Sequence, residues 1–536
     1  MLSPVAGPRF PDDPAGAYDA VIVGGGHNGL TAAAYLARAG RSVLVLERLP
    51  HTGGAAVSAR PFDGLDARLS RYAYLVSLLP QRIHDDLGLD IRLARRRYSS
   101  YTPVPGDPRG AGLLIDLSDA AATDASFAAI GAAGDAERFR ALYDDTTRIA
   151  QALWPTLTTP LPTRSEARAL LGDDALWDAV FERPLGEFVE SRVRDDLVRG
   201  VVLTDALIGT FAEAHDAGLQ QNVCFLYHVI GGGTGDWDVP IGGMGTVTTQ
   251  LAEAARAAGA RLQTDAEVTA ISPDGTVAFR TADGPERTVT GGHVLANVAP
   301  WVLEGLLGTP AAERAAKPRG AQVKVNLLLR RLPRLRDAAV GAEAAFGGTF
   351  HINERYTQLQ TAYDEAAAGG IPAVLPCEIY CHTLADRTIL GDELAASGAQ
   401  TLTVFGLHTP DALVDAETKD AQREQLQAAV LASLDSVLAE PVEDLLMTDA
   451  AGRPCIETKT TLDLEDALGM PGGHIFHGPL SWPFLGDDAP RDTPAQRWGV
   501  ATAHERILLC GSGAVRGGAV SGIGGHNAAM AVLEGH

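Results

Sequence analysis

The distribution of apolar residues predicts an α/β protein that begins with a strand–helix–strand unit. Residues 18–23 form a short apolar run rich in β-branched side chains, which is typical of a buried parallel strand. Small residues at 32–39 predict a helix, and a second apolar run at 42–46 predicts the next strand, which ends in Glu47. This order of elements is typical of a dinucleotide-binding βαβ unit.

Three glycines, Gly24, Gly26 and Gly29, follow the first strand with the spacing GxGxxG. The first allows a tight turn, the second lets backbone N–H groups approach a pyrophosphate, and the third lets the helix pack on the strand. We expect Glu47 to accept a hydrogen bond from a ribose hydroxyl. Because an acid there repels a 2′-phosphate, the pattern favours FAD or NAD over NADP. A glycine turn without a ligand is the alternative, and the arrival of strand, glycines, helix and acid in register argues against it.

The rest of the chain alternates between helical and strand periodicity. In order, the pattern predicts an apolar helix after a turn within 62–80, paired strands over 98–117, helices over 120–154 and onward to about 211, a helix at 246–258, a strand at 261–271, a hairpin and strand over 276–296, strands at 322–329 and twice within 378–408, and a helix at 418–438. The last part, 507–533, repeats the N-terminal order of apolar strand, glycine-rich loop and small-residue helix.

We therefore expect an α/β fold with two domains. The ranges are 18–60, 228–300 and 500–536 for a discontinuous Rossmann-type FAD-binding domain, 61–227 and 301–499 for an α+β substrate domain with a mixed sheet, and 1–17 for a flexible arm. Glycine-rich loops at both ends of one chain suggest a single long ligand that contacts both, and FAD has about the right length.

Composition narrows the possible partners and the location. The 536 residues carry a formal net charge of −23, from 44 basic and 67 acidic side chains, which argues against nucleic acid and against electrostatic docking on anionic lipid. A peripheral membrane contact through apolar residues stays possible. The chain shows neither a signal peptide nor a span of apolar residues long enough for a bilayer, so we expect a cytoplasmic protein. The five cysteines are scattered, which favours reduced thiols and no metal site.

Five segments carry a family resemblance: GGGHNGL at 24–30, ERLPHTGGAAVS at 47–58, GGMGTVTTQLAEAARAAGARLQTDAEV at 242–268, GGHIFHGPLS at 472–481, and CGSGAVRGGAVSGIGGHNAA at 510–529. Together they resemble the phytoene desaturase-like flavoproteins of the flavin amine oxidase superfamily. That group contains carotenoid desaturases, carotenoid isomerases, retinol saturase and a further oxidoreductase branch, which the segments resemble most. The resemblance implies non-covalent FAD.

The resemblance also implies a set of cofactor-binding residues. These are Gly24, Gly26, Asn28, Gly29, Glu47, Arg48, Gly53, Gly54, Ala55, Val268, Gly511, Ser512, Gly522 and Ile523. In the C-terminal segment, Val515 and Arg516 replace a His-Pro pair of the family motif, and Ala519 replaces its third glycine. These changes are expected where the loop would cover the isoalloxazine, which puts the substrate and the redox role in question.

Lys324, in QVKVNLLL, is the candidate catalytic residue. By resemblance to the flavin amine oxidases, it would reach the flavin N5 through a water, and a buried lysine could assist proton movement or the reaction with O₂. The alternative is a lysine at a strand end that extends to solvent. His474 and His477 could face the substrate, although a structural or exposed role is the more ordinary interpretation.

These expectations lead to one main functional hypothesis and two alternatives. The main one is an FAD-dependent oxidoreductase that abstracts hydride from a C–H bond of a small apolar organic substrate, giving C=C or C=N, with O₂ or a quinone as electron acceptor. The alternatives are a non-redox isomerase that uses reduced FAD and a non-catalytic FAD-binding scaffold. The sequence predicts neither the substrate nor the oligomeric state.

Overall fold

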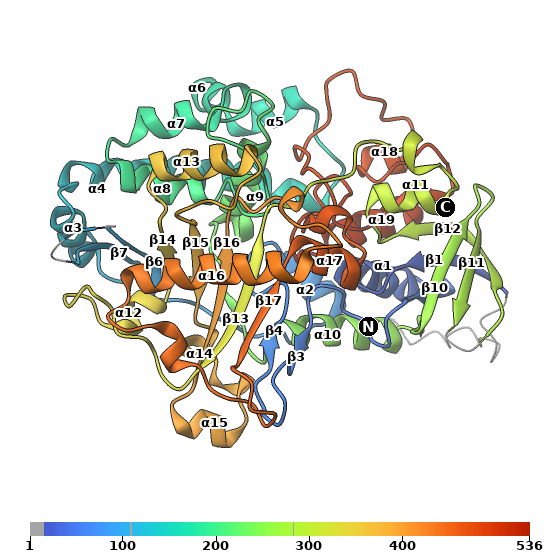
Figure 1. Ribbon diagram of the computed structural model, residues 1–536. Helices are drawn as coiled ribbons and strands as arrows, with labels where there is room; N and C mark the ends of the chain where they lie inside the picture. The colour runs from blue at the N-terminus through green and yellow to red at the C-terminus, as the bar shows by residue number, and fades with distance from the viewer. Residues whose placement is uncertain (1–15, 105, 108–109, 282–283, 536) are drawn as a thin grey trace.

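The computed structural model describes residues 16–104, 106–107, 110–281 and 284–535 (Figure 1). Most of the predicted N-terminal arm therefore lies outside the described residues, and Ala17 already begins strand β1. Two seven-stranded sheets organise the rest of the chain.

The first sheet is built from the two ends and the middle of the chain. Its strands are β1 (Ala17–Val23), β2 (Val43–Leu46), β9 (Arg261–Gln263), β10 (Ala266–Ile271), β11 (Thr276–Thr281), β12 (Arg287–Ala296) and β18 (Ile507–Leu509). β9, β2, β1, β12 and β18 run parallel in that order, while β10 and β11 pair antiparallel beside the first half of β12. The strand expected at 261–271 is two strands, because Asp265 adopts a left-handed φ of 52° and breaks the extended chain.

Helices α1 (His27–Arg38), α10 (Met244–Ala257) and α19 (Ile523–Glu534) pack on one face of this sheet. The other face buries β10, β11 and α11 (Pro300–Leu306). Helix α1 begins five residues earlier than the small-residue pattern indicates, directly after Gly26. Its backbone N–H groups are therefore at the glycine turn itself, as a dinucleotide-binding unit requires.

The second sheet has the strand order β17-β13-β16-β15-β14-β6-β7. Its bounds are β6 (Tyr98–Pro103), β7 (Gly112–Asp116), β13 (Val323–Leu329), β14 (Thr349–Ile352), β15 (Cys377–Tyr380), β16 (Gln400–Gly406) and β17 (Ile456–Lys459). All pairs are antiparallel except β14 with β6, so the sheet is mixed, as expected. Successive side chains alternate between two buried faces, and helix α16 (Lys419–Val437) crosses one of them (Figure 1).

The remaining helices are α2 (Gln81–Leu87), α3 (Ala120–Ala129), α4 (Ala136–Leu153), α5 (Arg164–Leu171), α6 (Asp174–Trp177), α7 (Leu185–Arg192), α8 (Asp196–Thr204), α9 (Gln220–Val229), α12 (Ala342–Phe346), α13 (Tyr356–Ala367), α14 (His382–Ala385), α15 (Asp392–Ser397), α17 (Thr461–Leu468) and α18 (Pro494–Arg497). Most of them lie around the second sheet and between the two sheets, whereas α2 and α18 pack with the helices of the first sheet. Short strands β3 (Ser58–Ala59) and β4 (Leu69–Ser70) pair with each other, as do β5 (Leu93–Ala94) and β8 (Val239–Pro240). Figure 1 shows α3 to α9 gathered as one helical region.

The prediction of an apolar helix within 62–80 is wrong. Residues 71–80, which we call the strap, contain neither helix nor strand. The N–H of Ala73 donates to the carbonyl of Ala55 (3.1 Å) and that of Val76 to Asp238 (3.0 Å). Because these bonds go to distant segments, the backbone is satisfied without a helix despite the apolar composition.

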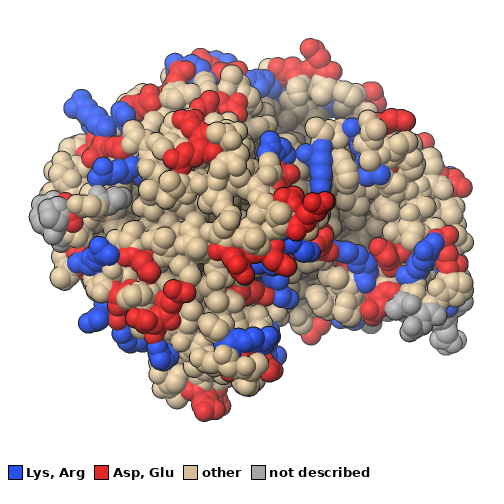
Figure 2. Space-filling view, in the orientation of Figure 1, with Lys and Arg blue, Asp and Glu red and all other residues tan. Residues whose placement is uncertain are grey.

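Acidic and basic side chains are interspersed on the face shown in Figure 2, over a predominantly uncharged surface. Such a face lacks the continuous basic surface that nucleic-acid binding uses. Within the described ranges, we find no helix long and apolar enough to span a membrane.

Candidate functional site

A cavity of about 820 Å³ connects the two sheets. Gly24, Gly26 and Glu47 line it at the first sheet, and Lys324 and Glu378 line it at the second. A volume of this size is that of a site for a cofactor or substrate. The cavity therefore joins the predicted dinucleotide turn to the predicted catalytic lysine.

The glycine turn is held by two side chains from neighbouring strands. The Glu47 carboxylate accepts hydrogen bonds from the backbone N–H groups of Gly25 (2.7 Å) and Leu49 (2.9 Å). Asn297, at the end of β12, donates from Nδ2 to the Gly24 carbonyl (2.9 Å). A Cβ on Gly26 would lie 3.1 Å from that Asn297 nitrogen. The turn thus has no room for side chains, and Asn297 is a positioning residue that the sequence pattern did not reveal.

The second glycine pair lies against the first. The N–H of Gly53 donates to the carbonyl of Gly25 (2.9 Å), and a Cβ on Gly54 would lie 3.2 Å from the Gly26 Cα. Gly53 and Gly54 have φ of 123° and 56°, which L side chains rarely adopt. The ERLPHTGGAAVS segment therefore packs directly against the glycine turn.

The C-terminal loop reaches the N-terminal turn through tight helix packing. A Cβ on Gly525 of α19 would lie only 1.9 Å from the Asn28 carbonyl of α1, so glycine is required where these helices cross. The Asn28 side chain also donates to the Gly517 carbonyl at 3.5 Å. Part of the C-terminal glycine content is thus explained by helix packing.

The predicted cofactor residues divide into two groups. Those that line the cavity are Gly24, Gly26, Glu47, Arg48, Gly54, Ala55, Val268 and Ser512. Those that lie beside it without lining it are Asn28, Gly29, Gly53, Gly511, Gly522 and Ile523. Gly29 belongs to the turn nonetheless, because a Cβ there would lie 2.3 Å from the Gly24 carbonyl oxygen.

The Arg516 side chain does not line the cavity, although its loop is expected to cover the isoalloxazine. It is fully buried and donates to the carbonyls of Thr156 (2.6 Å), Thr159 (2.7 Å) and Trp498 (3.2 Å). Its φ of 68° turns the backbone so that the side chain points away. Arg516 therefore ties the C-terminal loop to the helical region, while Ser512, Ala519 and Val520 face the cavity.

Two histidines face the cavity between the glycine loops. His27 Nε2 and His477 Nδ1 are buried and have no hydrogen-bond partner among the described residues. Burial lowers the pKa of His477 to about 4, and burial together with the nearby His477 lowers the pKa of His27 to about 4. Both rings are thus neutral near pH 7 and offer polar atoms to a bound group.

Lys324 is buried, with 3 % of its surface exposed, so the alternative of a solvent-directed lysine is wrong. Its Nζ donates to the carbonyls of Ser70 (2.9 Å) and Tyr72 (2.6 Å) and lies 4.7 Å from the centre of the Tyr74 ring. Burial holds the pKa of Lys324 well below its ordinary value, against the opposing charge of Glu457. The lysine thus has a strong tendency to be neutral.

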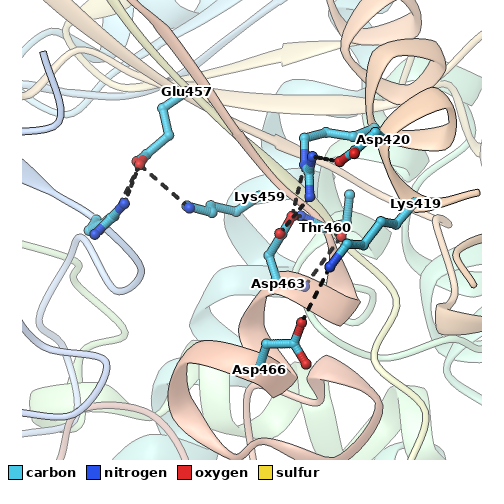
Figure 3. A network of polar contacts seen from close by, with 9 residues as sticks. Lys419, Asp420, Glu457, Lys459, Thr460, Asp463 and Asp466 are labelled. Carbon is cyan, nitrogen blue, oxygen red and sulfur yellow. Dashed lines mark hydrogen bonds and ion pairs between the residues drawn. The ribbon is translucent and has the colours of Figure 1, made fainter. Parts of the chain in front are cut away.

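A salt bridge fixes the strap that receives Lys324. Arg71 donates to Glu457 on β17 (2.6 Å), and Lys459 lies 3.6 Å from the same carboxylate, as Figure 3 shows for Glu457 and Lys459. Lys459 is also the residue opposite Lys324 in the β13–β17 register. The carbonyls that hold Lys324 are therefore anchored to the same sheet as Lys324 itself.

Lys324 is the first residue of a row that crosses four strands. The strand registers pair Lys324 with Phe405, Phe405 with Glu378, and Glu378 with His351. All four side chains line the cavity. Glu378 and His351 were missed by the sequence analysis, because nothing local distinguishes them from other polar strand residues.

The inner part of the cavity contains ionisable side chains, which the expectation of a small apolar substrate did not include. Burial raises the pKa of Asp205 to about 6, and burial together with Glu354 raises the pKa of Glu378. Burial lowers the pKa of His351, but the adjacent Glu354 carboxylate outweighs it and raises the pKa to about 9. Apolar walls lie alongside these groups, formed by Phe139, Val201, Ile208, Phe405 and Phe476.

Comparison with known proteins agrees with this geometry. Residues 22–85 match the family described as NAD(P)-binding Rossmann-like domain. The chain is 58 % identical to "Uncharacterized protein Rv0897c" of Mycobacterium tuberculosis over 524 residues, covering 96 % of this chain and 97 % of that protein. It is 29 % identical to the rat "Pyridine nucleotide-disulfide oxidoreductase domain-containing protein 2" over 565 residues, covering 96 % and 93 %.

Solved structures show the same fold at low sequence identity. A putrescine oxidase structure superposes with a TM-score of 0.56 at 18 % identity, covering 97 % of this chain and all of the other. The α/β fold with a Rossmann-like domain and a mixed second sheet is thus confirmed.

Proposed function

The chain belongs to the family of Rv0897c, and on that premise we propose that it is an FAD-dependent oxidoreductase of the flavin amine oxidase-like superfamily. It would abstract hydride from a C–H bond of an organic substrate with an apolar portion, giving C=C or C=N. O₂ or a quinone would be the electron acceptor. Bound FAD would supply the hydride acceptor.

The single observation that carries this proposal is the continuity of the cavity from the glycine turn to Lys324. A separate nucleotide pocket and substrate pocket would not bring a cofactor and a proton-accepting group together. In one shared cavity, the first sheet would bind the cofactor and the second sheet would line the substrate site.

The residues present fit FAD. The N-terminus of α1, facing the cavity at Gly26, would bind the pyrophosphate, and Glu47 would accept from a ribose hydroxyl. His27 Nε2 and His477 Nδ1 need partners that a flavin ring, with its N–H and carbonyl groups, can supply. Arg48 at the rim, Val268 on β10 and Ser512 would contact the remainder of the cofactor.

Lys324 would accept a proton at Nζ. Its donors are engaged by Ser70 and Tyr72, so a neutral Lys324 keeps its lone pair for a water or a substrate group. The Tyr74 ring beside Nζ and the Phe405 ring next in the row would exclude bulk water. The aromatic and aliphatic walls favour an apolar portion of the substrate.

The test begins with the absorption spectrum of the purified protein, which we expect to show oxidised flavin. The protein is then mixed anaerobically with amines and with polyenes, and bleaching of the flavin band is followed. Bleaching by either class supports oxidation, while turnover seen only after prior reduction with dithionite would indicate an isomerase. A flavin that dithionite reduces but organic donors leave unchanged would indicate a scaffold, and protein that binds NAD but no flavin would refute the proposal.

A further inference from the structure

Three ligand-bearing side chains meet at the inner end of the cavity, where the proposed reaction does not use them. His351 lies on β14, Glu378 lies opposite it on β15, and Glu354 follows β14. One ligand atom from each lies within 4.8 Å of the others. The three are 5 %, 1 % and 0 % exposed, respectively, so solvent does not screen them.

The local backbone is shaped to bring Glu354 back to His351. Asn353 has a left-handed φ of 61°, which reverses the chain after β14 and places the Glu354 Oε2 2.5 Å from His351 Nδ1. Helix α8 approaches so closely that a Cβ on Gly200 would lie 1.7 Å from the Glu354 carbonyl oxygen. From the same helix, Thr204 donates to Glu354 Oε2 at 2.6 Å. The cluster is therefore built from three separate parts of the chain.

An unsatisfied atom indicates that something further binds there. Glu354 Oε1 is buried and accepts no hydrogen bond from any described residue. A buried carboxylate oxygen without a donor costs free energy of roughly 1–3 kcal/mol or more. A hydrogen-bond donor such as water or a bound cation would remove this cost, and of these only the cation would also offset the carboxylate charge.

The charges around the cluster also favour a cation. Three acids, Asp205, Glu354 and Glu378, interact with one another there, against two bases, Arg96 and His351. Ionising all five groups would leave one net negative charge, a state that burial disfavours and that a bound cation would stabilise. A divalent ion with His351 as a neutral ligand would balance the three carboxylates together with Arg96.

We propose that His351, Glu354 and Glu378 form a binding site for a divalent first-row transition metal ion. One imidazole nitrogen with carboxylate oxygens is a donor set that suits Zn²⁺ or Mn²⁺ better than Ca²⁺ or Mg²⁺, and Zn²⁺ binds most strongly of these. The ion would replace the proton shared by His351 and Glu354. Because His351 and Glu378 line the cavity, the ion reaches the site from there.

Two neighbouring hydroxyl groups would orient the ligands. Tyr380 donates to Glu378 Oε2 (2.8 Å), and Thr204 donates to Glu354 Oε2. Such bonds hold ligating carboxylates in one orientation and contribute to affinity. They leave Glu354 Oε1 free for the ion.

The experiment uses the full-length protein as purified, after treatment with EDTA. Zn²⁺ is titrated by calorimetry, and the metal retained after desalting is measured by mass spectrometry. We expect about one Zn²⁺ per chain for the unaltered protein and at least tenfold weaker binding for Glu354→Gln and Glu378→Gln, each of which removes a charged ligand. Mn²⁺, followed by its electron paramagnetic resonance, is the second probe.

His408→Asn is the matched control. His408 is also buried with both ring nitrogens unpaired among the described residues, it lies outside the cluster, and asparagine tolerates its φ of 52°. This variant should retain Zn²⁺ as the unaltered protein does. The proposal would be overturned if the unaltered protein retained neither Zn²⁺ nor Mn²⁺. It would also be overturned if both glutamine variants retained as much metal as the unaltered protein. Neither readout depends on flavin turnover. If a variant does not fold, metal binding by the unaltered protein still tests whether the site exists.

Discussion

Lys324 Nζ lies 2.6 Å from the carbonyl oxygen of Tyr72, so strand β13 of the second sheet is hydrogen-bonded to the strap. We expect Lys324→Met to retain flavin but to slow its reduction or reoxidation by about 10²-fold, because methionine cannot accept a proton. Stopped-flow absorbance of the flavin measures both half-reactions. Unchanged rates would remove Lys324 from the mechanism.

The same substitution should also lower stability. It leaves the carbonyls of Ser70 and Tyr72 without their donor, at a cost of about 1–3 kcal/mol. Because Lys324→Arg and Lys324→Gln keep donors, they should recover part of the loss in urea denaturation. The kinetic defect should persist undiminished in Lys324→Gln while stability partly recovers, which separates the chemical role from the structural one.

Gly26→Val should give colourless protein. The added side chain would start 3.1 Å from Asn297 Nδ2 and would occupy the cavity where we place the pyrophosphate. The ratio of flavin absorbance to protein absorbance measures the effect. Gly134→Ala is the control, since a Cβ there meets nothing within 4 Å. Normal flavin content in Gly26→Val would contradict the placement of the cofactor.

Glu47→Gln tests the carboxylate that accepts from Gly25 and Leu49. A glutamine offers only one acceptor oxygen and turns an N–H₂ group toward a donor, so one backbone N–H loses its partner. We expect flavin affinity to fall by about 10- to 100-fold, corresponding to about 1.4–2.7 kcal/mol. The measurement is flavin fluorescence on dilution. Glu253→Gln, on the exposed face of α10, should bind as the unaltered protein does.

The sequence predicts those parts of this structure that are determined by residues close together in the chain. The first βαβ unit was predictable because strand, glycine turn and helix are contiguous. Asn297 contacts Gly24 across 273 positions, and no local pattern reports such a contact. The strap was predicted as a helix because its apolar content is visible in the sequence, while its partners Ala55 and Asp238 are not.

The candidate site shows the same division. Lys324 was found through the resemblance, and its strand through apolar periodicity. Glu378 and His351 share its row only because β13, β16, β15 and β14 pair in one register, which depends on the assembled sheet. The direction of the Arg516 side chain could not be predicted either, because it depends on a left-handed backbone and on carbonyl partners far away in the sequence.

Arg516→Lys should destabilise the protein without changing the flavin spectrum. The guanidinium bonds three carbonyls from a fixed planar fork, and a lysine cannot reproduce that geometry. We expect a loss of about 1.5–3 kcal/mol in urea denaturation. Arg256→Lys, at the exposed end of α10, should have no such effect. A shifted flavin spectrum in Arg516→Lys would mean that the side chain reaches the cofactor after all.

The buried histidines make stability depend on pH in a defined direction. Burial lowers the pKa of His408 to about 3 and that of His228 to about 4, below the ordinary 6.5. Between these values and 6.5 the unfolded chain binds protons that the folded chain does not, so the free energy of unfolding falls on acidification. Each such histidine contributes up to about 1.4 kcal/mol per pH unit, and the slope ends below the folded pKa. We therefore measure the free energy of unfolding by urea denaturation at several pH values. Between about pH 4 and 6, His408→Asn should reduce the slope of this free energy against pH by up to about 1.4 kcal/mol per pH unit, which corresponds to one proton. This holds whatever the effect of the substitution on stability at pH 8. Gly134→Ala, which changes no titratable group, should leave the slope unchanged. An identical slope in His408→Asn and the unaltered protein would show that His408 is not a buried neutral group in the folded state.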